Sequence, residues 1–148
     1  RAGGTLTPSL SGSSGSDTVT FTSIADIVNG NPVWSNSTRL ARTAAPEDAD
    51  DGVDNDHDGL IDEGQIVLTR DVGLLTQVSI VLCTDVPERA AGELANGVDD
   101  NGNTLSDESG FCLQQQNDLL TVRITIEQPG QGGSSVLSSV ETSFNLRN

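Results

Sequence analysis

The sequence is poor in aromatic residues and contains no lysine, methionine or tyrosine. Its 148 residues include one Trp, three Phe and one His, and only 3% are aromatic. A core with so few aromatic rings has to be built from Val, Ile and Leu, and two of these three favour strands over helices. No apolar run approaches the ~20 residues that cross a bilayer. The composition therefore predicts one mainly β domain and no membrane span within this chain.

The same scarcity argues against an enzyme. A Ser-His-Asp triad would need His57, which lies in a run of acids, and no nucleophile motif accompanies it. The glycine run 130–133 is not followed by the lysine of a phosphate-binding loop. Acids are numerous enough for a catalytic carboxylate pair, but nothing separates an acid from a base by environment. A net charge of -15 makes nucleic acid and anionic membranes poor partners. We expect a non-enzymatic protein.

The two cysteines, Cys83 and Cys112, are too few for a zinc site when the only histidine lies elsewhere. A disulfide between them is the first expectation, and a pair of buried thiols is the alternative. The bond would close a ring of about 30 residues and stabilise the fold by roughly 3–4 kcal/mol. It would also indicate an oxidising, extracellular compartment.

The negative charge is concentrated in two internal segments that repeat each other. Residues 47–63 hold nine acids and no base, and residues 88–108 hold six acids and one arginine. A shift of 45 residues aligns GVDNDHDGLIDE at 52–63 with GVDDNGNTLSDE at 97–108. Side-chain oxygens recur at positions 1, 3, 5, 9 and 10 of both copies, counted from Asp54 and Asp99. A solvated acidic tail would lie at a terminus and would lack this pattern.

Alternating oxygen ligands in a tight loop are typical of Ca²⁺ sites, because this ion takes six to eight oxygens and position 7 can add its backbone carbonyl. Gly59 at position 6 permits the sharp turn. We therefore expect two Ca²⁺ ions, with weaker binding in the second copy, where two asparagines replace carboxylates. The alternative is a pair of acidic turns without metal. The predicted ligands are Asp54, Asp56, Asp58, Leu60, Asp62 and Glu63 in the first copy and Asp99, Asn101, Asn103, Leu105, Asp107 and Glu108 in the second.

The first copy begins like an EF-hand loop and then departs from it. Position 12 is Gln65, so Glu63 at position 10 is the nearest acid that could close the site, and neither flank has helical periodicity. The two loops resemble the helix-free calcium loops of thrombospondin type 3 repeats and related bacterial surface proteins.

Strands are expected around these loops. Alternating apolar residues predict strands at 18–24, 64–70, 77–83, 120–127 and 136–146, with the last two forming a long hairpin. Short helices are expected at 23–28 and 87–94. Residues 1–16 have the composition of a flexible arm or linker, which leaves 17–148 as the β-rich calcium-binding domain. Asn36 begins a glycosylation sequon. The predicted fold is an antiparallel, sandwich-like single domain with two inserted calcium loops.

A wider resemblance rests on the segments DTVTFTSI, PVW, DGVDNDHDGLIDEG followed by QIVLTRD, NDLLTVRITIE and VETSFNLRN. Over 17–148 this order resembles the head of type IV pilin-like proteins, in particular minor pseudopilins, although their apolar N-terminal helix is missing here. The resemblance implies an extracellular or cell-surface structural subunit that assembles with copies of itself or with other pilin-like subunits. The alternative is a calcium-dependent adhesion or carbohydrate-binding module with a ligand face around Trp34.

Overall fold

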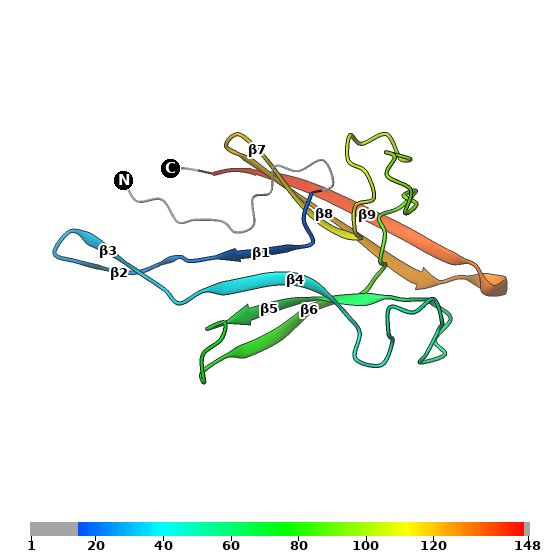
Figure 1. Ribbon diagram of the computed structural model, residues 1–148, viewed down its shortest axis with the longest axis horizontal. Coiled ribbons are helices and arrows are strands. Elements are labelled where there is room, and N and C mark those ends of the chain that lie inside the picture. Colours follow the sequence, from blue (N-terminus) through cyan, green and yellow to red (C-terminus); the bar gives the residue numbers. More distant parts are fainter. Residues whose placement is uncertain (1–14, 147–148) are drawn as a thin grey trace.

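The computed structural model describes residues 15–146, which form nine antiparallel strands in three sheets (Figure 1). The only helix among these residues is a 3₁₀ turn at Gln131–Gly133. The mainly β prediction is confirmed, including the C-terminal hairpin. The strands are β1 (Thr18–Phe21), β2 (Ile24–Val28), β3 (Asn31–Trp34), β4 (Thr38–Ala44), β5 (Gly64–Arg70), β6 (Val78–Val86), β7 (Phe111–Gln116), β8 (Leu119–Pro129) and β9 (Ser135–Asn145).

Two of the sheets pack on each other around a small core. One has the order β1-β4-β5-β6 and the other β7-β8-β9, while β2 and β3 form a separate hairpin that projects from one end (Figure 1). The core is aliphatic apart from one ring, as the composition predicts. Its buried members are Val19, Ile66, Val86, Phe111 and Leu113. Leu120, Val122 and Ile124 of β8 pack against this cluster, which confirms the predicted inward face of that strand.

The edges of the sheets are open. All eleven residues of β9 are exposed, and Val140 and Phe144 are 62% and 53% exposed. The apolar face that alternation predicts on β9 is therefore present but lies in solvent. The chain enters the fold at another edge, where Ser16 and Leu113 exchange backbone hydrogen bonds of 2.9 and 2.7 Å. Residues 1–14 of the expected arm lie outside the described residues.

Two expectations about helices are wrong. Residues 24–28 form β2, and the segment 87–94 consists of turns and bends. The likeness to a pilin-type head is also wrong, because such a head combines an N-terminal helix with an α/β fold, whereas no helix of seven or more residues occurs within residues 15–146. Here one sheet packs on another sheet and no helix covers either of them. Nor is any described helix long and apolar enough to cross a membrane.

The expected disulfide is also absent from the described residues. Cys83 on β6 packs against the core cluster, on the same side as Ile66. Cys112 lies between Phe111 and Leu113, so strand alternation turns its side chain to the opposite face of β7. There its sulfur lies beside Gly15. The two thiols therefore lie on different sides of the β7 sheet, a difference that the spacing of the cysteines in the sequence could not reveal.

Candidate metal centre

The two acidic segments form loops that leave the sandwich between consecutive strands. The first loop, residues 45–63, joins β4 to β5 within one sheet, and the second loop, residues 90–108, joins β6 to β7 across the two sheets (Figure 1). Each loop is closed at its base by one backbone bond, from the N–H of Ala45 to the carbonyl of Glu63 (3.3 Å) and from Ala90 to Glu108 (2.9 Å). The sequence repeat is therefore also a structural repeat.

Asp62 in the first loop and Asp107 in the second were expected to be metal ligands. Each instead accepts hydrogen bonds from backbone N–H groups near the start of the repeat in its own loop. Both oxygens of Asp62 accept the N–H of Gly52 (2.8 and 2.9 Å), and one of them also accepts that of Asp51 (2.8 Å). Asp107 makes the same bonds to Gly97 and to the residue before it. These N–H donors lower the pKa of Asp107, the bond from Gly97 having the larger effect. Both carboxylates are thus committed to backbone donors.

The first position of each repeat organises the turn. Asp54 accepts the N–H of His57 (2.5 Å) and of Gly59 (3.1 Å). These two residues have positive φ angles of 68° and 97°, so the chain coils tightly around the Asp54 carboxylate. Glycine suits such a conformation because it has no Cβ. Asp99 holds the equivalent turn of the second loop, where Thr104 takes the glycine's place at a φ of 75°.

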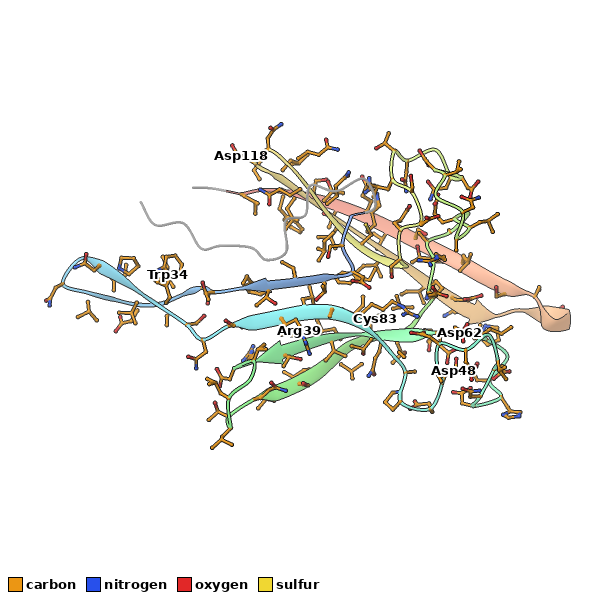
Figure 2. All side chains as sticks on the ribbon, viewed as in Figure 1. Trp34, Arg39, Asp48, Asp62, Cys83 and Asp118 are labelled. Atoms are coloured by element: carbon orange, nitrogen blue, oxygen red, sulfur yellow. The ribbon has the colours of Figure 1, made fainter. Side chains whose placement is uncertain are left out.

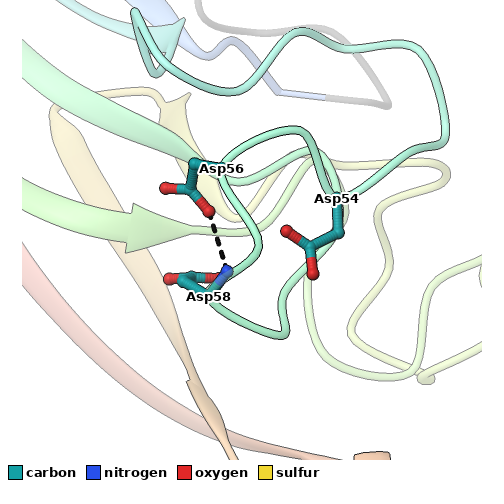
Figure 3. Close-up of side chains that lie close together, drawn as sticks. All are labelled: Asp54, Asp56 and Asp58. Atoms are coloured by element: carbon teal, nitrogen blue, oxygen red, sulfur yellow. Dashed lines mark hydrogen bonds between the residues drawn. The ribbon is translucent and has the colours of Figure 1, made fainter.

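Three carboxylates meet inside the first loop. Asp54, Asp56 and Asp58 each bring a carboxylate oxygen within 4.8 Å of the other two (Figure 3). One oxygen of Asp56 accepts the N–H of Asp58 (3.0 Å), and one oxygen of Asp58 accepts that of Leu60 (2.9 Å). The spacing of the sequence thus predicts this cluster correctly. Three like charges at this separation repel one another, and a cation among them reverses the sign of the interaction.

Glu63 and Asp48 add two buried carboxylates to the same region. Glu63 is 4% exposed and Asp48 is fully buried, and each has one oxygen, Oε2 and Oδ2, without a hydrogen-bond partner among the described residues. Burial raises the pKa of Glu63 to about 7, with a further contribution from the neighbouring Asp48 carboxylate. The N–H of Asn55, 2.7 Å from Asp48, is the main cause that lowers the pKa of Asp48. The proton of this pair therefore resides on Glu63.

A cavity of about 260 Å³ opens beside this cluster. Its lining includes Asp56, Asp58 and Glu63 together with two further acids, Glu47 and Asp85, and no arginine from the described part of the chain. A strongly negative cavity rich in carboxylate oxygens suits a hard divalent cation better than the softer transition metals.

Asp48 is the residue that sequence reasoning missed. It lies 45 residues before Glu93, so the repeat begins at least four residues earlier than the aligned motif. Glu93 is 6% exposed and accepts the N–H of Asp100 (3.1 Å), of Asn101 (3.0 Å) and of Asp107 (2.9 Å). In both copies, the acid at this position accepts hydrogen bonds from backbone N–H groups of its own loop. The 45-residue shift that aligns the two loops also pairs Asp48 with Glu93, so the sequence alone could have identified this position.

The leucine at position 7 of each loop is buried. Leu60 and Leu105, which were expected to offer only a carbonyl oxygen, have side chains that are 2% and 0% exposed. A fully buried leucine stabilises a fold by roughly 1.5–3 kcal/mol relative to an exposed one. The structure therefore gives these residues a packing role that the ligand pattern does not contain.

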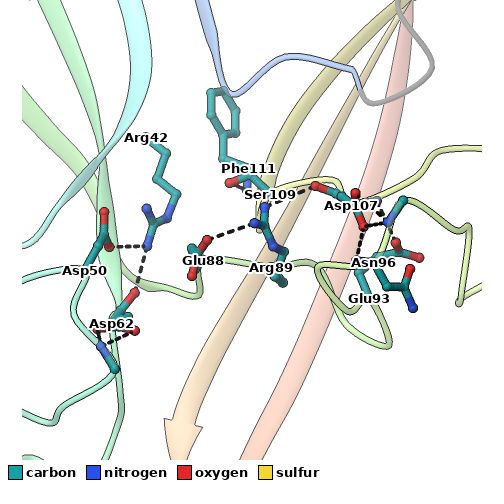
Figure 4. Close-up of polar contacts among 12 residues, drawn as sticks. Arg42, Asp50, Asp62, Glu88, Arg89, Glu93, Asn96, Asp107, Ser109 and Phe111 are labelled. Atoms are coloured by element: carbon teal, nitrogen blue, oxygen red, sulfur yellow. Dashed lines mark hydrogen bonds and ion pairs between the residues drawn. The ribbon is translucent and has the colours of Figure 1, made fainter.

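Arginines connect both loops to their surroundings (Figure 4). The Arg42 guanidinium is 7% exposed and donates to the carbonyls of Asp62 (2.8 Å) and Val86 (3.2 Å), which joins β4, the first loop and β6. Arg89 donates to the carbonyl of Asp107 (3.2 Å) in the second loop.

The remaining sequence-predicted residues lie far from the loops along the chain. Asn36 is exposed in the connection between β3 and β4, where its side-chain amide donates to Asp71 at 2.9 Å, and its glycosylation stays a prediction. Trp34 ends β3 in the projecting hairpin (Figure 2). The cavity beside that hairpin is lined by Phe21, Asn36 and Asp71, among others, and not by the indole.

The geometry establishes a group of aspartates that could hold a metal ion, and it does not identify the ion. Comparison with protein-family models, with curated proteins and with solved structures gave no match to this chain.

Proposed function

We propose that the chain is a non-enzymatic, extracellular structural module that is stabilised by Ca²⁺ bound in the first loop. The observation that carries the proposal is the cluster of Asp54, Asp56 and Asp58 next to Glu63, whose buried Oε2 has no partner among the described residues. A buried carboxylate oxygen is costly unless a hydrogen-bond donor or a cation satisfies it. A divalent ion at this point would coordinate Oε2 of Glu63 and compensate the repulsion among the three aspartate carboxylates.

Calcium is the ion that this loop favours. Ca²⁺ accepts six to eight oxygens in irregular arrangements, whereas Mg²⁺ requires near-octahedral geometry and retains several waters. Side-chain oxygens and the carbonyl at position 7 can supply such an irregular shell. Extracellular modules bind calcium at roughly 10⁻⁴–10⁻³ M, which matches the concentration outside cells.

A structural role is supported by the place of the loop in the fold. The first loop joins β4 to β5, the two central strands of the four-stranded sheet, and Arg42 of β4 anchors it to that sheet. An ion that holds this loop therefore braces the middle of the sheet and not its rim.

The open edge at β9 supports assembly with copies of the same chain. Its exposed strand offers unpaired backbone groups, which is the usual route by which sheets join. Glu141 is the only charged residue on β9, and Arg123 neutralises it at 2.6 Å. Little on this edge opposes the approach of a second strand.

Thermal unfolding with calcium and with a chelator tests the calcium part of the proposal. We expect calcium in the millimolar range to raise the melting temperature by several degrees, and Mg²⁺ to do so much less. The double variant Asp56→Ala/Asp58→Ala should lose the response, while Asp118→Asn, a change of charge on an exposed turn away from the loop, should keep it. An unchanged melting curve across the calcium range would refute calcium binding.

Analytical ultracentrifugation tests the structural part. The calcium-loaded protein should associate as its concentration rises, and Val140→Lys on the open edge should suppress this association without unfolding the monomer. A wild-type protein that stays monomeric at every concentration would exclude self-assembly as its role.

A further inference from the structure

The two loops share a backbone but differ in the atoms that point inward. We propose that only the first loop takes calcium, and that the second loop is held closed by the amide groups of Asn101 and Asn103, so that the chain binds one ion. This inference rests on the proposed calcium site of the first loop and concerns which residues decide whether such a loop needs an ion.

Equivalent backbone bonds show that the two loops are directly comparable. Asp56 accepts the N–H of Asp58, and Asn101 accepts that of Asn103, both at 3.0 Å. One residue pair further on, Asp58 accepts the N–H of Leu60 and Asn103 that of Leu105, both at 2.9 Å. In each loop, one terminal oxygen of the side chains at positions 3 and 5 accepts a backbone N–H and holds the turn. Only the other terminal atom, an oxygen in Asp or the NH₂ nitrogen in Asn, can face the interior of the loop.

The identity of that second atom differs between the loops. In Asn101 and Asn103 the oxygen accepts a backbone N–H, which fixes the orientation of the amide and turns its NH₂ group inward. Both NH₂ groups donate to Oε1 of Glu108, the one from Asn101 at 2.9 Å. In the first loop the same two places hold carboxylate oxygens, which cannot donate to Glu63. Donors thus stand in the second loop where the first has only acceptors.

The walls of the two cavities differ in the same sense. The second cavity, of about 250 Å³, is lined by Asn101, Asn103, Glu108 and Arg123, among others. Within the described residues, Nη1 of Arg123 and Oε2 of Glu108 both lack a hydrogen-bond partner, and both residues line this one cavity. Arg123, which pairs with Glu141, puts a positive charge on the wall of the second cavity, whereas the residues that line the first cavity include several acids and no arginine.

A calcium ion in the second loop would therefore meet three obstacles. It would face the NH₂ groups of two amides, and rotating those amides to present oxygen would break the bonds to the N–H groups of Asn103 and Leu105. It would also approach Arg123, a like charge. The first loop has no NH₂ group at positions 3 and 5, and its nearby arginine, Arg42, is not among the residues that line its cavity.

Exchanging residues between the loops tests the inference. Calcium is titrated calorimetrically into the full chain, the double variant Asn101→Asp/Asn103→Asp, and the matched double variant Asp56→Asn/Asp58→Asn. Each substitution replaces one planar group by another of nearly equal size. We expect about one ion per wild-type chain, about two in the Asn-to-Asp variant, and none in the Asp-to-Asn variant, which should remain folded without calcium.

The outcomes separate this inference from the proposed function. No calcium bound by the wild type would refute the site itself. Two ions bound by the wild type would leave the calcium site standing and overturn the amide-closed second loop. If the Asn-to-Asp variant does not fold, NMR spectra of the wild-type backbone amides decide instead. The resonances of 52–63 should shift when calcium is added, while those of 97–108 should not. Shifts in both segments would overturn the inference.

Discussion

Calcium binding should release protons, and the number released should fall with pH. Glu63 has a pKa raised to about 7 and faces the cluster in the first loop. A cation binds the ionised carboxylate, so any proton on Glu63 must leave first. At pH 6 a group with this pKa is about nine-tenths protonated and at pH 8 about one-tenth, so binding should release about 0.9 and about 0.1 proton per ion.

Calorimetry in buffers with different ionisation enthalpies measures this proton count directly. As the pH rises towards 7, the dissociation constant for Ca²⁺ should fall by up to about tenfold per pH unit. Above pH 7 it should level off. The variant Glu63→Gln keeps the shape of the side chain and removes its proton, so it should show no release at either pH. A count near zero for the wild type at pH 6 would refute a protonated Glu63 facing the ion.

The same group sets the stability of the calcium-free protein. Its pKa in the folded state lies above the ordinary value of 4.5, so between these two values the folded state binds more protons than the unfolded state. Stability should therefore decrease as the pH rises from about 4.5 through about 7, and saturating calcium should remove this decrease. Urea unfolding at several pH values, with and without calcium, measures both trends. A calcium-free protein that becomes more stable over this interval would contradict the assignment of the proton to Glu63.

Three further changes test the packing of the fold. Leu105→Ala removes a fully buried side chain and should lower the free energy of unfolding by about 2–5 kcal/mol in urea titrations; a loss below half a kcal/mol would mean that the loop is not anchored there. Thr104→Gly should stabilise the protein by up to about 1 kcal/mol, because a β-branched residue holds a φ of 75° there, and destabilisation would show that the Thr side chain contributes more than the strain costs. In the folded protein Cys83 should react with a thiol reagent faster than Cys112, which is 1% exposed and whose pKa burial raises to about 11; equal rates, or the absence of reactive thiols after unfolding, would contradict the structure.

The sequence predicts strands well where alternation is uninterrupted. β5 begins and ends at the predicted residues, and the C-terminal hairpin is found within a residue or two at its ends. The helix expected at 23–28 is instead the strand β2, because a tight turn follows it. Asn29 and Gly30 have φ angles of 52° and 78°, the conformation that Asn-Gly supplies in tight hairpins. Local turn chemistry here outweighs the spacing of the apolar residues.

The candidate site was predicted in part. The repeat identified Asp54, Asp56 and Asp58, because ligand spacing is a local property of the chain. It did not reveal that Asp62 is bound to backbone donors, since this depends on how the loop closes on itself. Nor did it show that Arg123 of β8 lines the second cavity, because that cavity forms only when the second loop packs against β8 and β9.

Each loop, closed by a single backbone bond at its base, is a portable unit. The bonds that shape it come from its own residues, and its ends lie as close together as two neighbouring strands. The chain uses it once between adjacent strands of one sheet and once between sheets, so the same unit fits two different connections. Such a segment could replace the turn of an unrelated β-hairpin, and the choice of Asp or Asn at its third and fifth positions would then decide whether the recipient responds to calcium.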